Sequence, residues 1–290
     1  MPAAEVDIDA TLVRALLREQ HPDLAGLDLT LLASGWDNTI FRLGDTLTVR
    51  LPHRRLAAPL IEHEQRWLPE LAARLPLPIP APVRQGRPAH GYPWSWSVTP
   101  WFPGTPACDA SLSDLALAAR TLGQFVAALH RPAPADAPEN PWRGTPLIER
   151  GSRVHEHLTQ LEGTVDTDAL RSLWVELVET PPWPGEPLWI HGDLHPANVL
   201  VHDGKLSAVI DFGDLTSGDP ATDVSVAWML LPPQLRGEFR TAAGDIDDNT
   251  WARARAWALS LGLVYVAVSH EHPRMVRIGR EVLDAVLADG

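Results

Sequence analysis

Apolar and polar residues recur along the chain with two different periods, and the change between them outlines the predicted elements. Helical spacing, with apolar residues three and four positions apart, appears near residues 8–20 and again at 57–75. Runs rich in Leu, Ile, Val and Thr, bounded by Gly, Asp and Pro, predict strands at 27–34, 38–44, 46–52, 80–86 and 92–102. The first three strands follow one another through tight turns, which predicts an antiparallel meander.

Helical spacing dominates after Pro103-Gly104. It predicts helices at 113–130, 147–161, 168–179, 221–231, 250–269 and 275–287. Ser111 or Ser113 is the expected cap of the first of these. A β-rich insert at 187–214 interrupts the helices, and its Asp203-Gly204 pair is typical of a hairpin turn. The sequence therefore predicts an α+β protein with a sheet-rich lobe at 1–102, a connector at 99–104, and a helical lobe at 103–290.

Composition narrows the possible partners. The 290 residues carry a formal net charge of −13, which argues against sequence-independent binding to nucleic acid and suits a cationic small molecule. No apolar run is long enough to span a bilayer, and the first ten residues lack the order of a secretory signal. Cys108 is the single cysteine, so an intrachain disulfide is excluded and a cysteine-based zinc site is not expected. We therefore expect a cytoplasmic protein that is a monomer or a homodimer and has no membrane partner.

The segment WIHGDLHPANVLV, residues 189–201, places polar groups in a short loop between two apolar runs. Asp193 and Asn198 lie in this loop, and Asp211 ends the next apolar run, so a tight hairpin can bring the three side chains together. Two carboxylates and an amide suit Mg²⁺, a hard cation that prefers oxygen ligands and shares its remaining positions with water and phosphates. A carboxylate that does not bind the metal can accept the proton of an attacking hydroxyl, as phosphoryl transfer requires.

HGDLHPAN followed by IDFGD resembles the catalytic-loop and metal-loop motifs of the aminoglycoside phosphotransferase family. This family of small-molecule relatives of protein kinases also includes macrolide, choline and sugar kinases. The resemblance covers nearly the whole chain and implies a bilobal, protein-kinase-like fold. It implies that Asp193 is the catalytic base or orients the acceptor hydroxyl, that Asn198 and Asp211 hold Mg²⁺, and that His191 braces the loop.

Two further residues of this region follow from the same resemblance. His195 lies near the acceptor or points to solvent. Asp223 supports the catalytic loop from the start of the next helix.

The resemblance also implies that the first lobe binds ATP or GTP. The segment SGWDNTIF occupies the place of the phosphate-covering loop, although it has a single glycine, and Ser34, Gly35, Asp37 and Asn38 are its candidate donors. Arg50 stands where most kinases have the lysine that grips the α- and β-phosphates. Its guanidinium keeps the charge but is larger and has a different donor geometry.

Two more parts of the nucleotide site are implied by position. Glu64 is the expected partner of Arg50, with Glu62 as the competitor. Backbone groups near Thr99 and Trp101 would bind the purine, although Pro100 has no N–H to donate.

The acceptor is less defined. Acidic candidates for its pocket are Asp214, Asp219 and Glu271, which would favour an aminoglycoside-like cation; aromatic candidates are Trp228, Trp257 and Tyr265, which would favour a macrolide or similar bulky molecule. The resemblance implies transfer of a γ-phosphate to such a hydroxylated antibiotic or metabolite, with antibiotic resistance as one physiological role.

Two alternatives remain open at this stage. Arg50 suggests a pseudokinase that binds nucleotide without turnover. A metal-dependent hydrolase would use His191, Asp193, His195 and Asp211 as ligands.

Overall fold

A computed structural model describes residues 4–244 and 246–289, and the chain divides into two compact units. The first unit comprises Met1–Pro103 together with Ile210–Gly213, and the second comprises Gly104–Val209 with Asp214–Gly290. The return of Ile210–Gly213 to the first unit was not anticipated from the sequence. The first three residues, on which the expected absence of a secretory signal partly depends, lie outside the described part of the chain.

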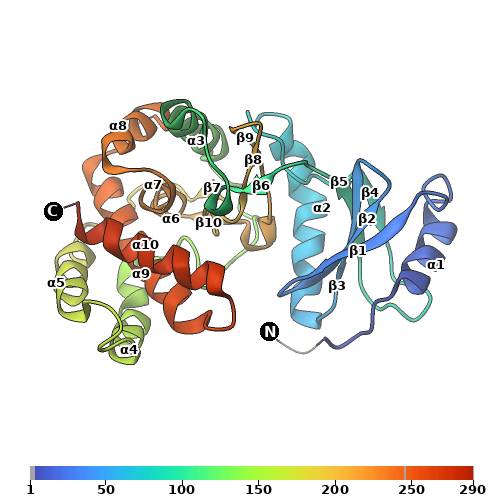
Figure 1. The fold of residues 1–290 in the computed structure, drawn as a ribbon, viewed down its shortest axis with the longest axis horizontal. Helices are drawn as coiled ribbons and strands as arrows, with labels where there is room; N and C mark the ends of the chain where they lie inside the picture. The colour runs from blue at the N-terminus through green and yellow to red at the C-terminus, as the bar shows by residue number, and fades with distance from the viewer. Residues whose placement is uncertain (1–3, 245, 290) are drawn as a thin grey trace. The chain divides into compact units, whose positions relative to one another are not determined.

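The first unit is built on an antiparallel sheet in which the strands lie in the order β1-β2-β3-β5-β4 (Figure 1). Their bounds are β1 Leu29–Ser34, β2 Asn38–Leu43, β3 Leu47–Pro52, β4 Arg84–Gly86 and β5 Trp96–Pro100. The helices of this unit are α1 Ala10–Gln20 and α2 Ala58–Ala72, with a short 3-10 turn at Arg55–Ala57. The predicted meander of β1, β2 and β3 is confirmed.

Helices α1 and α2 lie on opposite sides of this sheet (Figure 1). Successive side chains of β3 point to opposite faces of the sheet. Val49 and Leu51 join a buried cluster that includes Leu16 and Leu17 of α1. Arg50, between them in sequence, points the other way and reaches α2. The period of two along this strand is therefore what places a charged side chain opposite an apolar core.

The second unit consists mainly of helices. They are α3 Leu115–Leu129, α4 Gly151–Gln160, α5 Thr167–Val178, α6 Ala221–Val224, α7 Val226–Leu230, α8 Pro233–Ala242, α9 Asp248–Val268 and α10 Pro273–Leu287. Helix α9 is buried on almost every side, and α10 packs along it, while α3 packs against α8 (Figure 1). A helix with apolar residues all round belongs in a core, which agrees with the central place of α9.

Short strands of the second unit carry the polar hairpin. Strands β6 Thr105–Pro106, β8 Val199–His202 and β9 Lys205–Val209 form one small sheet, and β7 Leu188–Ile190 pairs with β10 Thr216–Gly218 in another. Asp203 and Gly204 both have positive φ, 49° and 72°, as the predicted two-residue hairpin turn requires. Further 3-10 turns lie at Ala107–Asp109, Leu147–Arg150 and Phe212–Asp214.

Some local predictions for the helical unit were wrong. The cap of α3 is Asp114, whose carboxylate accepts a hydrogen bond from Leu117 N, whereas Ser113 donates to the carbonyl of Gly204. The predicted helix at 221–231 is divided at Ser225, because its hydroxyl bonds the carbonyl of Thr222 and competes with regular helix geometry. Helix α8 was not predicted, since it begins at a Pro-Pro pair that resembles a break but is tolerated in a first helical turn.

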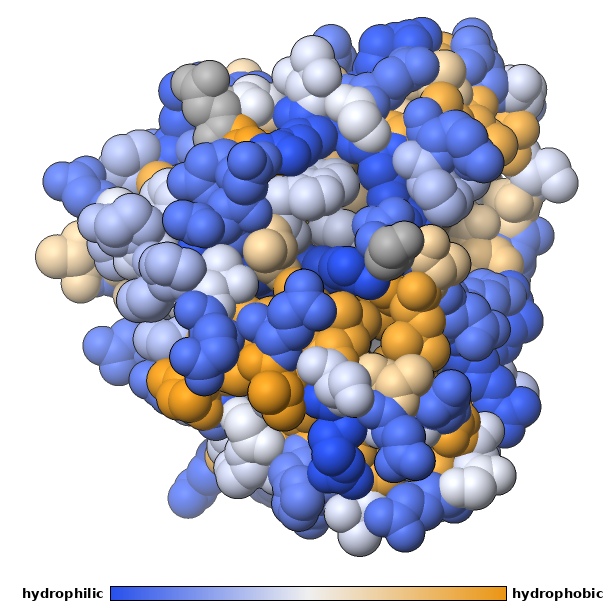
Figure 2. Space-filling view, turned by 90° about the vertical axis from the view of Figure 1, so that its left-hand side faces the viewer, coloured by the Kyte–Doolittle hydropathy of each residue, from blue (hydrophilic) through white to orange (hydrophobic). Residues whose placement is uncertain are grey.

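The surface of the helical unit is mixed in character. Figure 2 shows apolar residues gathered among polar ones on one face of the molecule. The exposed apolar side chains of this unit include Ile148 and Val175. Within residues 4–244 and 246–289, we find no helix that combines the length and the apolar character of a membrane span.

Candidate active site

The predicted catalytic loop connects β7 to β8 and depends on a sharp change of chain direction at Gly192. This residue has a φ of 82°, and a Cβ atom placed on it would lie 2.4 Å from the carbonyl oxygen of Asp214. Only glycine meets both conditions without strain. The HGD sequence therefore allows the loop to pass directly beside the chain that follows the metal loop.

Asp223, at the start of the next helix, holds this loop in place. Its buried carboxylate accepts hydrogen bonds from the backbone N–H groups of His191 and Gly192, at 2.7 and 2.9 Å. The ring of His130 lies 3.2 Å from the same carboxylate. The supporting role expected for Asp223 is thus confirmed, and His191 adds to it because its Nδ1 accepts from the Asp193 amide at 3.2 Å.

The Asp193 carboxylate lies among donors. Asn198 Nδ2 donates to Oδ2 at 3.4 Å and to the Asp193 backbone carbonyl at 3.0 Å, His195 Nε2 lies 3.2 Å from Oδ2, and Arg143 donates to Oδ1 at 3.2 Å. Burial by itself would raise the pKa of Asp193, but the charges of His195 and Arg143 and the His195 hydrogen bond lower it well below its usual range. Asp193 is therefore ionised at any physiological pH, which suits a group that orients a hydroxyl better than a strong base.

His195 points inward and does not extend into solvent. It is 5% exposed, its Nδ1 accepts from the Ala197 amide, and its ring meets that of Tyr265 edge to face at 5.4 Å. Burial, followed by the nearby charge of Asp193, raises the pKa of Tyr265 well above its ordinary value. Tyr265 therefore remains protonated and can donate a hydrogen bond beside the catalytic loop.

Two residues near Asp193 were missed by sequence reasoning. Arg143 and Asn140 come from the long connection between α3 and the turn at Leu147, and both contact the Asp214 carboxylate, at 3.1 and 2.7 Å. Nothing in the segment ENPWRG distinguishes it from an ordinary polar loop. Only the tertiary structure brings these side chains to the catalytic loop.

The other predicted acceptor residues have different surroundings. Asp219 pairs with Arg253 at 2.6 Å, and both are buried. Trp228 donates to Asp289 at 2.8 Å and packs against Trp251. The remaining two differ in exposure: Trp257 is fully buried, and Glu271 is exposed between α9 and α10. Of the predicted set, Asp214 and Tyr265 are the ones near Asp193.

In the first unit, Arg50 and Glu64 form the predicted ion pair. Arg50 donates to Glu64 Oε2 at 2.6 Å, with both residues buried, while Glu62 accepts from Ser95 instead. Burial would lower the pKa of Arg50, but the charges of Glu64 and Asp211 raise it above its ordinary value. Arg50 therefore stays positively charged, and its ion pair with Glu64 of α2 orients its guanidinium group.

Asp211 belongs to the first unit and has an unusual backbone conformation, with a φ of 64°. A positive φ costs energy in a residue other than glycine and is often found at functional positions. Its side chain is exposed and close enough to Arg50 and Glu64 to influence the pKa of both. The Asp211 carboxylate therefore lies near the Arg50–Glu64 pair.

The predicted phosphate-covering loop between β1 and β2 is tied to the end of β3. The Gly35 amide donates to the Asn38 carbonyl at 2.9 Å, and the Asp37 carboxylate pairs with Arg54. His53 lies 3.1 Å from the Trp36 carbonyl. Gly35 N–H and Asp37 are therefore occupied within the loop, so Ser34 and the Asn38 side chain are its remaining candidate donors.

The predicted purine-binding stretch is partly used by the sheet. Trp101 N–H donates to the Thr46 carbonyl at 2.7 Å, and the hydroxyls of Thr99 and Thr48 share a hydrogen bond of 2.7 Å. The Trp101 N–H is therefore unavailable to a purine, and Pro100 has no N–H to donate. Carbonyl oxygens are what this stretch can still offer.

The chemistry of Asn198 and Asp211 fits Mg²⁺. The amide nitrogen of Asn198 is directed to Asp193, which leaves its oxygen to act as a ligand, and Asp211 supplies an exposed carboxylate. Few protein ligands suffice for Mg²⁺, since water and phosphates complete its coordination. Within the described residues, no group of three or more His, Cys, Asp or Glu side chains is arranged to hold a metal.

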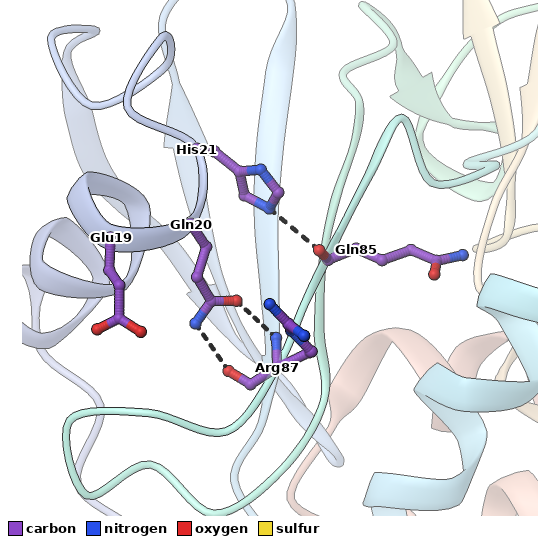
Figure 3. A pocket seen from close by; sticks show the side chains of 5 residues that line it. All are labelled: Glu19, Gln20, His21, Gln85 and Arg87. Atoms are coloured by element: carbon purple, nitrogen blue, oxygen red, sulfur yellow. Dashed lines mark hydrogen bonds between the residues drawn. The ribbon is translucent and has the colours of Figure 1, made fainter.

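A polar pocket of about 430 Å³ lies elsewhere in the first unit (Figure 3). It is lined by Glu19, Gln20, His21, Gln85 and Arg87. The Gln20 side chain exchanges two hydrogen bonds with the Arg87 backbone, and His21 bonds the Gln85 carbonyl. This pocket contains none of the predicted site residues, and its polar groups largely satisfy one another.

A family comparison decides the broad assignment. Residues 28–257 match the model described as the phosphotransferase enzyme family. The chain belongs to this family. The match includes the β1–β2 loop, Arg50, Glu64, the catalytic loop and Asp211, whereas Tyr265 lies beyond the matched residues.

Solved structures agree on the fold. The GDP complex of an aminoglycoside 2'-phosphotransferase-IIIa superimposes with a TM-score of 0.70 at 18% sequence identity, covering 97% of this chain and 99% of the other. A macrolide 2'-phosphotransferase from Brachybacterium faecium gives 0.61 at 22% identity, covering 94% and 97%. The protein therefore has the α+β, kinase-like fold predicted from its sequence.

Proposed function

We propose that this protein transfers the γ-phosphate of ATP or GTP to a hydroxyl group of a small molecule of the aminoglycoside-like or related antibiotic and metabolite classes. The observation that carries the proposal is the fixed Asp193 carboxylate, held by the loop that Asp223 anchors and flanked by the Asn198 amide. Family membership supports phosphotransfer, and neighbours of the same fold are named as aminoglycoside and macrolide phosphotransferases.

In the proposed reaction, Asp193 accepts a hydrogen bond from the acceptor hydroxyl and aims its oxygen at the γ-phosphorus. The acceptor oxygen forms the new P–O bond, and the bond to the β,γ-bridging oxygen breaks, so that nucleoside diphosphate leaves with that electron pair. The hydroxyl proton passes to Asp193. Since the low pKa of Asp193 makes it a weak base, most of its contribution is positioning.

The first unit supplies the residues proposed to bind the nucleotide. Arg50, kept charged and aimed by Glu64, would bind phosphate oxygens, and Ser34, Gly35 and Asn38 belong to the loop that would cover them. Thr99 and Trp101 mark the purine-binding stretch. Asn198 and Asp211 would hold Mg²⁺, which neutralises phosphate charge when bound.

The proposal includes a cytoplasmic location, where ATP and GTP are available, and a role in antibiotic resistance if the acceptor is an antibiotic. A monomer or a homodimer is compatible with it.

The deciding experiment is phosphate transfer followed by mass spectrometry, with Mg-ATP and Mg-GTP supplied against pooled aminoglycosides, macrolides, amino-alcohols and sugars. We expect a product one phosphate heavier than its acceptor, and its loss in Asp193→Asn. Asp203→Asn is the matched control, because Asp203 lies in the exposed hairpin turn and Asn tolerates its positive φ. Nucleotide binding without any product would support the pseudokinase alternative; metal binding without nucleotide affinity would support the hydrolase.

A further inference from the structure

Two of the three carboxylates predicted to attract a cationic acceptor, Asp214 and Asp219, are paired with arginines of the chain. Asp214 accepts from Arg143 at 3.1 Å and from Asn140 at 2.7 Å. Asp219 is held by Arg253 through contacts of 2.6 and 3.3 Å, deep in the unit. An ammonium group entering beside Asp193 would have to compete with a resident guanidinium at Asp214 and has no access to Asp219.

Arg143 bridges the two carboxylates of the site. The same nitrogen, NH2, lies 3.2 Å from Asp193 Oδ1 and 3.1 Å from Asp214 Oδ2. With the side chain 17% exposed, this positive charge is poorly screened by water. A second cation next to Asp193 would therefore face repulsion at close range.

The position of Arg143 is set by the residue that follows it. Gly144 has a φ of 67°, its N–H donates to Thr222 Oγ1 at 3.2 Å, and its carbonyl accepts from Asp219 N at 3.0 Å. A Cβ atom there would lie 2.9 Å from Ile190 Cδ1 and 3.0 Å from Gly218 Cα. The loop backbone is thus packed tightly against β7 and β10, which fixes the point from which the Arg143 side chain extends to Asp193 and Asp214.

Unused hydrogen-bonding capacity near Asp193 also points to an oxygen-bearing ligand. Arg143 Nε is buried without a hydrogen-bond partner, and the buried Tyr265 hydroxyl lies close enough to Asp193 to interact with its carboxylate. Arginine has donors only, and a protonated Tyr265 can donate. Hydroxyl, ether or carbonyl oxygens can accept from these groups, whereas an ammonium group has nothing to accept with.

We propose that Arg143 determines acceptor specificity, so that the site takes an uncharged, oxygen-rich hydroxylated molecule and rejects a polycationic amino sugar. This rests on the proposed phosphotransferase function, which it narrows. Arg143 acts by repelling positive charge and by donating to acceptor oxygens, while Asp193 remains the group that contacts the reacting hydroxyl.

The test uses one scaffold in two charge states, kanamycin and its fully N-acetylated derivative, together with pooled neutral sugars and macrolides. We expect calorimetric titration to give a Kd for kanamycin at least about tenfold lower in Arg143→Gln, where Asp193 and Asp214 are freed, than the Kd, or the lower limit of Kd, of the wild-type protein. Arg143→Lys keeps the charge and should still reject kanamycin. Arg120→Gln is the matched control, since it removes the same charge from an exposed pair with Glu238.

Turnover provides the second readout. Phosphorylated products should come from neutral members of the pools, and Arg143→Gln should reduce their kcat/KM by about tenfold or more. Tight kanamycin binding to the wild-type protein, or equal binding in Arg143→Gln with thermal unfolding unchanged, would overturn the specificity proposal. If no pool member is phosphorylated, the phosphotransferase proposal fails separately, because the titration measures charge selection without turnover.

Discussion

Single residues in the loop between β7 and β8, and Asp223 beside it in α6, perform tasks that few other side chains can perform. Gly192 lets the chain turn beside Asp214, Asp223 receives two backbone N–H groups, and Asp193 is surrounded by Arg143 and His195. Because each of these contacts is made in a buried or half-buried place, the loss of one leaves its partner unsatisfied. The loop therefore has little tolerance for substitution, in contrast to the exposed hairpin that follows β8.

Substitution of Gly192 should be strongly destabilising. In Gly192→Ala the methyl group would overlap the Asp214 carbonyl and occupy a left-handed conformation, at a combined cost of about 3 kcal/mol. Urea denaturation would measure this loss. Gly151→Ala is the control, because Gly151 opens helix α4 with no atom near its Cβ position and should be neutral or slightly stabilising. A Gly192→Ala protein with unchanged stability would show that the loop can adopt another backbone conformation without cost, contrary to this prediction.

Among the elements, α9 connects stability to the site, because it carries Arg253 against Asp219 and Tyr265 against His195. Its first turn is capped by Asp247, whose carboxylate accepts from Thr250 N at 2.5 Å. This hydrogen bond, together with nearby arginines, lowers the pKa of Asp247 below its ordinary value of 3.8. The cap therefore stabilises the charged form of the side chain.

The lowered pKa of Asp247 predicts a pH-dependent contribution to stability. A carboxylate with a lowered pKa in the folded state contributes its stabilisation above its unfolded pKa, near 4, and loses it as pH falls through the folded value. Asp247→Ala should thus lower the free energy of unfolding by about 1 kcal/mol at pH 7, and by less at pH 3. Parallel urea denaturation at both pH values, with Asp166→Ala at the cap of α5 as a comparison, would check this. An equal loss of stability at both pH values would show that the charge of Asp247 does not contribute to the stabilisation.

At the scale of the molecule, the chain separates its tasks between two compact units. The first contains Arg50, Glu64 and Asp211, and the second contains Asp193, Asn198 and Arg143. Mg²⁺ is proposed to bind Asp211, Asn198 and the phosphates of the nucleotide. Nucleotide and metal binding should accordingly depend on each other.

Mg-nucleotide should stabilise the whole protein against heat. At a concentration about 100-fold above Kd, binding contributes about 2.7 kcal/mol and should raise the unfolding temperature by about 5 °C. Removal of Mg²⁺ with a chelator, or Asp211→Asn, should abolish most of this shift, whereas Asp203→Asn should retain it. Differential scanning fluorimetry with ATP and with GTP would measure the shifts. The same shift with and without Mg²⁺ would rule out the proposed metal ligands.

Most of the fold could be predicted because its signals are local. The periods of apolar residues located α1, α3, α9 and the β1–β3 meander, and the Asp203-Gly204 pair located the hairpin. The errors occurred where a local signal was ambiguous: two prolines begin α8, and Asp114 competes with Ser113 for the cap of α3. In both places the start of the helix depends on how the folded helix packs, which a local sequence pattern does not contain.

The sequence by itself indicated the class of phosphotransferases, because HGDLHPAN and IDFGD resemble the motifs of that family and hold the proposed catalytic and metal-binding groups within two short segments. The tertiary structure alone decided which charges surround Asp193. Arg143 lies 50 positions before Asp193, in a loop without periodicity, and reaches it because Gly144 packs against β7 and β10. Electrostatic interactions depend on distance in space and on burial, and neither can be read from a position along the chain.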